Sequence, residues 1–161
     1  MTETSHVVAH FNDNRRLKGT TQDFFPNRPT FHIIPAGGGP AVQVPCKLLK
    51  AVFFVKTLEG TRGRISVPGF IAAPPATAHG KKIAVLFKDG ELLCGYTLSY
   101  LPDREGFFLF PADPESNNIR AYVLAAATAE VKAGPAAEAL ASSATVYFPA
   151  RAAIGSLQHS Q

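Results

Sequence analysis

The sequence predicts an all-β protein of two tandem, pseudo-symmetric small barrels, each of five strands, followed by a C-terminal extension. Three observations carry this prediction. Residues 7–36 and 83–112 align without a gap at a shift of 76 and share ten identical residues over thirty positions. Both segments begin with a run in which every second residue is a large or apolar residue able to face inward, the period of two that is typical of a half-buried strand. The 13 Gly and 13 Pro fit short strands joined by many turns.

A repeat of fixed period means that one supersecondary unit is used twice. The identical pairs are Phe11/Phe87, Asp13/Asp89, Leu17/Leu93, Gly19/Gly95, Thr21/Thr97, Pro26/Pro102, Arg28/Arg104, Phe31/Phe107, Pro35/Pro111 and Ala36/Ala112. The same shift aligns Val55-Lys56 with Val131-Lys132, so we expect one register throughout. Because a unit of about fifty residues is near the lower limit for folding alone, the two units should pack together. We place the first barrel at 1–56, the linker at 57–81, the second barrel at 82–132 and the extension at 133–161.

Each barrel should begin with a hairpin whose first strand lies at residues 7–12 or 83–88. The side chains expected to face inward are Val7, Ala9, Phe11, Ile83, Val85 and Phe87, and those expected to face outward are Val8, His10, Asn12, Ala84, Leu86 and Lys88. Asp89-Gly90 is a hairpin-turn signal, and Asn14 stands at the place of Gly90. Both positions should therefore adopt positive φ.

The second strand of each unit, at residues 17–22 and 93–98, carries a glycine in its middle. Gly19 and Gly95 indicate a sharp bend or a close approach of two backbones. Further strands are expected at 31–34, 41–44 and 49–56, and at 107–110, 119–126 and 128–132. The linker should hold a short strand at 64–71, and the extension a short Ala-rich helix at 136–144 and a strand at 145–148.

The composition predicts a globular, cytoplasmic protein. Hydrophobic residues make up 46% of the chain and charged residues 17%, a balance that excludes a disordered protein. No apolar run approaches the roughly 20 residues that span a bilayer. The N-terminus has no signal-peptide pattern. Cys46 and Cys94 form no CxxC motif and are interpreted as ordinary thiols.

The positive charge is concentrated in the first unit. Residues 1–56 carry seven Lys and Arg against three Asp and Glu, whereas residues 81–132 carry six against seven. A basic patch on the first barrel would bind phosphates without reading a sequence. The alternative is that these charges only keep the protein soluble. The candidate members of the patch are Arg15, Arg16 and Lys18, with Lys47 and Lys50 as further candidates.

Arg28 and Arg104 are the sharpest candidates for ligand binding. Each follows Pro-Asn or Pro-Asp in the corresponding turn, so the same guanidinium is displayed twice on a rigid support. A guanidinium in that position suits a carboxylate or a phosphate. The alternative is an intramolecular clamp, in which each arginine binds loop carbonyls or the turn aspartates Asp13 and Asp89.

Leu86, Phe108 and Phe110 are large apolar side chains that should face outward in the second barrel. A monomer seldom leaves such a patch bare. The first explanation is burial between the two barrels or under the C-terminal segment. The second is an interface with a partner or with another copy of the chain.

No residues point to a metal, a cofactor or a catalytic centre. His10 and His32 both face outward, but two histidines without a nearby carboxylate make a poor zinc site. The run Gly37–Gly39 is followed by neither Lys-Ser/Thr nor a helix, unlike a phosphate-binding loop. We therefore expect a protein that is not an enzyme.

The repeat resembles the first motif of the Sm-like family. The likeness rests on Lys88-Asp89-Gly90, Gly95, Asp103 and Phe108-Leu109, and Ile119-Arg120-Ala121 is similar to the second Sm motif. The resemblance implies a strongly bent five-stranded barrel, SH3-like in shape, in a family that forms rings and binds RNA. Gly106 or Thr30 stands where that family's RNA site has Asn, so the resemblance supports the barrel more than RNA binding. The Pro-x-Arg-x-x-Phe spacing also resembles an uncharacterised bacterial family of repeat proteins.

These observations lead to one functional hypothesis and one alternative. The leading hypothesis is a cytoplasmic binding or scaffolding module whose ligand is a protein, another copy of the chain or an extended polyanion. The alternative is nucleic-acid or nucleotide binding through the basic first unit.

Overall fold

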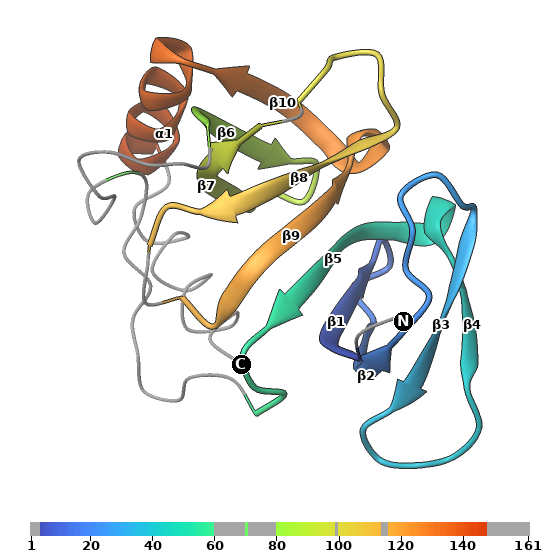
Figure 1. Ribbon diagram of the computed structural model, residues 1–161. Coiled ribbons are helices and arrows are strands. Elements are labelled where there is room, and N and C mark those ends of the chain that lie inside the picture. The colour runs from blue at the N-terminus through green and yellow to red at the C-terminus, as the bar shows by residue number, and fades with distance from the viewer. Residues whose placement is uncertain (1–3, 60–69, 71–79, 99, 114–115, 148–161) are drawn as a thin grey trace.

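The computed structural model describes residues 4–59, 70, 80–98, 100–113 and 116–147 (Figure 1). It confirms an all-β protein with a single α-helix among those residues. The strands are β1 (Ser5–Phe11), β2 (Arg16–Thr21), β3 (Thr30–Pro35), β4 (Val42–Pro45), β5 (Leu49–Val55), β6 (Lys81–Phe87), β7 (Leu92–Thr97), β8 (Gly106–Pro111), β9 (Asn118–Leu124) and β10 (Thr128–Ala133). The 3₁₀ turns η1 (Cys46–Leu48) and η2 (Ala125–Ala127) precede β5 and β10, and the helix is α1 (Pro135–Tyr147). No described helix is long and apolar enough to cross a membrane.

The ten strands form one antiparallel sheet in the order β10-β6-β7-β8-β9-β5-β1-β2-β3-β4. The sheet folds into two lobes that meet where β5 pairs with β9 (Figure 1). Within each lobe the strands follow the same order, because the last strand pairs with the first and the others follow in sequence. The β5–β9 pair, which we call the seam, joins the two halves of the chain.

The expectation of one constant shift is wrong beyond the third strand of each unit. Ile33 pairs with Val42, nine positions later, whereas Leu109 pairs with Ala121, twelve positions later. From there on the halves correspond at a shift of 79. Val131 therefore lies where Val52 lies, not where Val55 lies. The additional residues lengthen β9, which pairs along β5.

The seam is buried on both faces, because β5 divides its side chains between two cores. Val52 and Phe54 pack with the first half, and the alternating residues Ala51, Phe53 and Val55 pack with the second. All seven residues of β5 are buried. Because apolar burial is the main favourable term in folding, this shared strand ties the stabilities of the two halves together.

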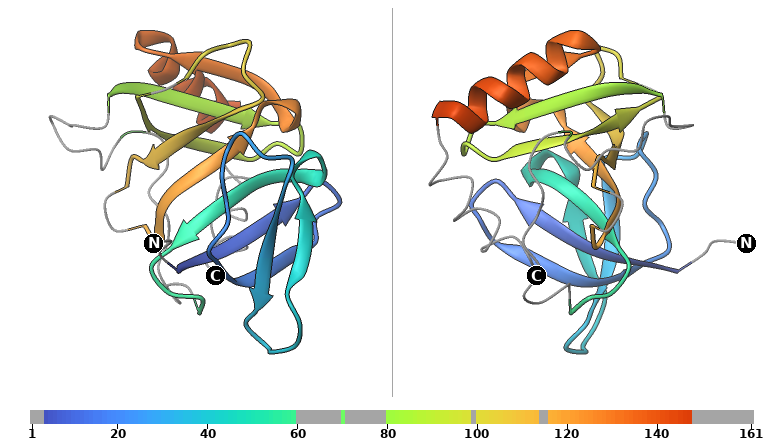
Figure 2. Two further views of the ribbon diagram at one scale, coloured as in Figure 1. Left: turned by 45° about the vertical axis from the view of Figure 1, so that its right-hand side comes forward. Right: turned by 90° about the vertical axis from the view of Figure 1, so that its left-hand side faces the viewer.

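Two side chains that the sequence predicts to face outward, those of Val8 and Ala84, are buried. Val8 is 6% exposed and packs in the second core, because that half covers the outer face of β1. Ala84 is fully buried with Ala137 and Ala141 of α1, which lies against β6, β7 and β10 (Figure 2). Alternation along a strand predicts that one face of the strand is buried. It carries no information about which other element covers the opposite face.

The helix expected at 136–144 is confirmed and is longer, because α1 runs from Pro135 to Tyr147. The strand expected at 145–148 is therefore wrong for residues 145–147, where the preceding Ala-rich turns continue the helix past Thr145 and Val146. Residue 148 lies outside the described residues. The strand expected at 64–71 also lies outside the described residues, except for Phe70. The ring of Phe70 contacts the ring of Tyr96.

The expectations for special backbone positions are confirmed. Asn14 has φ of 72° and Gly90 has φ of 94° in the two hairpin turns. A Cβ on Gly19 would lie 2.1 Å from the carbonyl oxygen of Ile34, and a Cβ on Gly95 the same distance from that of Phe110. These two glycines let neighbouring strands approach where the sheet bends.

Candidate binding surface

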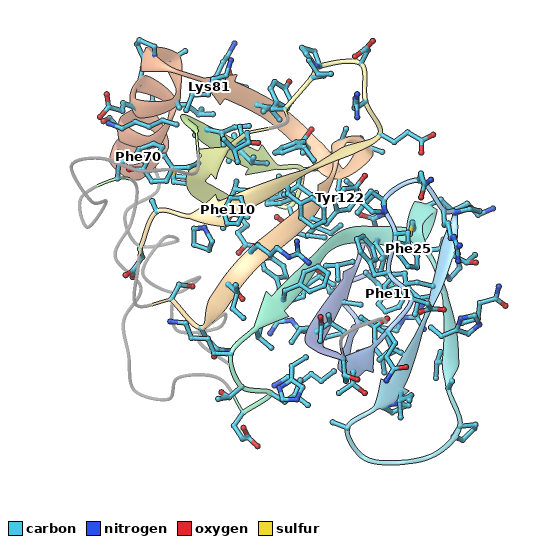
Figure 3. The ribbon with its side chains drawn as sticks, in the orientation of Figure 1. Phe11, Phe25, Phe70, Lys81, Phe110 and Tyr122 are labelled. Carbon is cyan, nitrogen blue, oxygen red and sulfur yellow. The ribbon has the colours of Figure 1, made fainter. Side chains whose placement is uncertain are left out.

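Four aromatic rings gather beside the seam, and we call Phe24, Phe54, Phe108 and Tyr122 the seam cluster. The ring centroid of Phe24 lies 5.6 Å from that of Phe54, 6.3 Å from that of Phe108 and 5.3 Å from that of Tyr122. The Phe108 and Tyr122 rings, from directly opposite residues of β8 and β9, are 5.0 Å apart. Gly106 makes room for the Tyr122 ring, because a Cβ there would come within 2.6 Å of it. Tyr122 lies at the junction of the lobes (Figure 3).

Arg120 extends from β9 over this cluster. Its guanidinium carbon is 4.5 Å from the ring centroid of Phe54 and 4.6 Å from that of Phe108. Partial burial lowers the pKa of Arg120, because removal of water disfavours the charged form. An arginine nevertheless stays protonated in proteins. No described residue accepts a hydrogen bond from this guanidinium or forms an ion pair with it.

Arg28 and Arg104 lie on matching turns, as the sequence predicts. The Arg28 amide donates to the Phe25 carbonyl at 3.0 Å, and the Arg104 amide donates to the Leu101 carbonyl at 3.1 Å. Both side chains are exposed, and neither forms an ion pair with a described residue. The Arg28 guanidinium carbon lies 4.6 Å from the centroid of the Phe25 ring.

The alternative in which Asp13 and Asp89 clamp these arginines is wrong. Asp13 binds Arg15, which is two residues away in the same hairpin, at 2.7 Å. Asp89 binds Lys50 at 2.7 Å, and Glu91 binds it as well. Lys50 reaches them because it is the extra residue of a β-bulge in β5, and its side chain is only 7% exposed. Lys50 is therefore not part of an exposed basic patch.

The two arginine turns lie near the Tyr122 end of the seam cluster. The Cys46 thiol donates a long hydrogen bond, 3.8 Å, to the carbonyl oxygen of Arg28. Burial raises the pKa of the Tyr122 hydroxyl, the Cys46 thiol and Glu105 raise it further, and Arg104 opposes them. Cys46 packs against the core that contains Tyr122, and the Glu105 carbonyl accepts a hydrogen bond from the Ala125 amide at 2.8 Å.

The structure does not bring the predicted basic residues of the first unit together. Arg16 and Lys18 share one face of β2, opposite His10 and Val8 of β1. The Lys18 ammonium donates to the carbonyl oxygen of Leu58 at 3.2 Å. Arg15 stays at its hairpin with Asp13. Arg28 lies in the loop beyond the other end of β2, so the patch is divided among three places.

The predicted apolar interface residues lie in three different surroundings, each of them half-buried. Phe108 belongs to the seam cluster, which agrees with burial between the two halves. Leu86 pairs with Leu92 in the part of the sheet that packs against α1. Phe110 lies opposite Tyr96 on the neighbouring strand β7 (Figure 3). An interface that uses all three stays a prediction.

His10 and His32, on the outer face of the first half, contact a phenyl ring and a carboxylate. The centroid of the His10 ring lies 4.5 Å from that of Phe53, with the two rings tilted by 53°, and His32 Nδ1 lies 2.7 Å from a carboxylate oxygen of Asp23. In the part of the chain that the structure describes, no three His, Cys, Asp or Glu side chains are placed to hold a metal ion.

Arg120 is the functional candidate that the sequence pattern missed. It stands in the Ile119-Arg120-Ala121 segment, between apolar residues of a predicted strand. A charged residue in an otherwise apolar strand is a usable signal, but only the pairing of β9 with β5 places Phe54 opposite it.

In the comparison with known protein families, a family model matches residues 3–134. The chain belongs to DUF6982, a family of unknown function. The part that matches DUF6982 contains all ten strands and ends before α1, so the family is defined on the whole sheet and not on one half of it. No curated protein and no solved structure matches the chain.

Proposed function

We propose that this protein is a non-enzymatic binding module of two small barrels joined edge to edge, and that its ligand binds over the seam cluster. The observation that carries the proposal is Arg120, a partly desolvated guanidinium held over two phenyl rings without an acidic partner among the described residues. Arg28 and Arg104 add two exposed guanidinium groups on the turns near the Tyr122 end of the seam cluster, and we include them in the proposed surface.

Two features support the two-barrel interpretation. Each half repeats one strand order, which suits the Sm-like or SH3-like barrel that the sequence resembles. Each half also places a β-bulge at the same position of its closing strand, at Lys50 in β5 and at Ala129 in β10. A bulge bends a strand, as closure of a small barrel requires.

The chemistry of Arg120 favours ligand binding over a purely structural role. Removal of water from a charged group is unfavourable unless hydrogen bonds replace the water. The two rings compensate in part through cation–π attraction, but they accept no strong hydrogen bond from the N–H groups. A carboxylate or phosphate would accept two parallel hydrogen bonds from the guanidinium edge. We propose that the ligand supplies this anion.

The proposal of a non-enzymatic protein is supported by the state of the thiols. Burial raises the pKa of Cys46 and raises that of Cys94 to about 12, so both are held in the form that is a poor nucleophile. The scattered positions of Arg15, Arg16 and Lys18 do not favour nucleic-acid binding by the first half, which is left as an outcome of the test.

Affinity capture tests this proposal. Immobilised wild-type protein, Arg120→Gln and Arg15→Gln would be incubated with an extract of the native cell, and retained proteins and nucleic acids would be identified. Because Arg120→Gln removes the charge but keeps a polar side chain with the same carbons up to Cδ, we expect molecules retained by the wild type and by Arg15→Gln to be lost. Equal recovery by all three proteins would contradict the proposal. Loss with Arg15→Gln alone would move the site to the basic first half.

A further inference from the structure

On the basis of the proposed function, we infer that the ligand is an extended acidic segment of a partner protein. Its Asp or Glu side chains bind Arg120 at one end of the seam cluster and the Arg28 and Arg104 turns at the other. This assignment rests on the placement of the arginines along β9, the burial of the rings and the apolar residues of the two turns.

The arginines follow the direction of β9. Arg120 and Tyr122 lie on the same face of this strand, two residues apart, which corresponds to roughly 7 Å. The Arg104 turn lies beyond the Leu124 end of β9, because Gly106 pairs with Leu124 and the Ala125 amide donates to the Glu105 carbonyl at 2.8 Å. An extended peptide presents alternate side chains on one side with the same spacing of roughly 7 Å. A peptide that runs along β9 can therefore present acidic residues to Arg120 and, further on, to the Arg104 turn.

The rings are packed in a way that disfavours nucleobases. Phe54 is 5% exposed and Tyr122 is 6% exposed, so neither offers a free face. Phe24 meets its neighbours edge to face. Phe25 is 39% exposed, but the guanidinium of Arg28 lies over its ring. Single-stranded nucleic acids bind by stacking bases on exposed aromatic faces, together with a continuous basic groove.

The two arginine turns also supply apolar anchors. Phe25 and Leu101 occupy the same position in their turns, three residues before Arg28 and Arg104, and Leu101 is 47% exposed. Proline at the next position holds each turn rigid, so little entropy is lost on binding. Phenylalanine and arginine are both enriched at protein–protein interfaces. The surface therefore fits a peptide that alternates acidic with apolar residues.

Peptide selection tests the inference on the full-length protein. A display library of random twelve-residue peptides would be selected on the wild type, in parallel with a library of random RNA 20-mers. We expect enriched peptides with Asp or Glu at alternate positions. The consensus peptide and its Gln/Asn counterpart would then be titrated by fluorescence anisotropy against the wild type, Arg120→Gln, the double variant Arg28→Gln/Arg104→Gln, and Arg15→Gln.

The expected result is a loss of affinity of about tenfold or more with Arg120→Gln, with the double variant and with the uncharged peptide. Arg15→Gln should bind like the wild type, and thermal unfolding would show that each variant is folded. A peptide consensus without acidic residues, or acidic peptides that bind all variants equally, would overturn the inference.

The RNA library separates this inference from the proposed function. If RNA is enriched and its binding is lost with Arg120→Gln, the site is right and the acidic-peptide inference is wrong. If neither library yields a binder that depends on Arg120, both the inference and the proposed function are wrong.

Discussion

The Cys94 thiol provides a test of packing at the level of a single residue. It is buried between β7 and α1, and burial raises its pKa from 9.0 to about 12. Because the folded-state pKa exceeds the unfolded one, the folded state holds the proton more tightly. The resulting stabilisation is complete below about pH 9 and is lost as the pH rises through about 12. Wild-type protein should therefore become less stable over this range.

Urea unfolding at pH 8 and pH 10.5 measures this effect when wild type is compared with Cys94→Ala. Between the two pH values the wild type should lose on the order of 1–2 kcal/mol more than the variant, which has no thiol to ionise. Contributions from Tyr122 and Cys46 are present in both proteins and cancel. Parallel changes in the two proteins would show that Cys94 does not titrate as its burial requires.

Single residues were predictable where local chemistry decides their role. Asn14 and Gly90 adopt positive φ because hairpin geometry demands it, and both positions were recognised from turn signals alone. The roles of Lys50 and Arg120 were not predictable from the sequence, because they depend on partners far away along the chain. Lys50 meets Asp89 and Glu91 across the two halves, and nothing within its own strand indicates those carboxylates.

At the level of elements, the glycines of β2 and β7 decide whether the sheet can bend. A Cβ on Gly95 would lie 2.1 Å from the Phe110 carbonyl oxygen and 2.6 Å from a Leu109 methyl group. Gly95→Ala should therefore destabilise the protein by about 2–4 kcal/mol, because backbone and core must both shift. Chemical denaturation measures this loss.

Gly37→Ala is the matched control for that substitution. Gly37 is exposed, and a Cβ there would meet nothing within 4 Å. We expect a change within about 0.5 kcal/mol. If both variants are equally stable, the close approach of β7 and β8 is not what requires glycine at position 95.

The elements themselves follow from local patterns more completely than their pairing does. The alternation, the turn glycines and the Ala-rich segment place all ten strands and α1 to within a few residues. They do not show that β5 lies between two cores, although its unbroken apolar run after Lys50 is typical of a strand buried on both faces. The candidate site depends on this pairing, since β5 supplies Phe54 and β9 supplies Arg120 and Tyr122.

At the level of the whole molecule, the seam raises the question of why the sheet stops at β4 and β10. These edge strands occupy the same places in their halves as β9 and β5, which pair with each other. An unpaired edge is a template for another strand unless charges or prolines block it. In β10, Glu130 and Lys132 stand where β5 has Ala51 and Phe53. Glu130 pairs with Leu86 and Lys132 with Ala84 in the second half. In the same way, Ala51 pairs with His10 and Phe53 with Val8 in the first half. Both charged residues are exposed.

We therefore predict that Glu130 and Lys132 keep the β10 edge from pairing with the β4 edge of another copy. The double variant Glu130→Ala/Lys132→Phe gives β10 the residues that β5 uses at the seam, and it should associate head to tail, because such an interface leaves a free edge at each end. Sedimentation velocity over a range of concentrations would detect species larger than those of the wild type. Lys88→Phe, which adds the same ring at an exposed hairpin position, should not change the distribution. If the double variant sediments like the wild type, the charges on β10 are not what ends the sheet, and the shortness of β4, at four residues, becomes the better explanation.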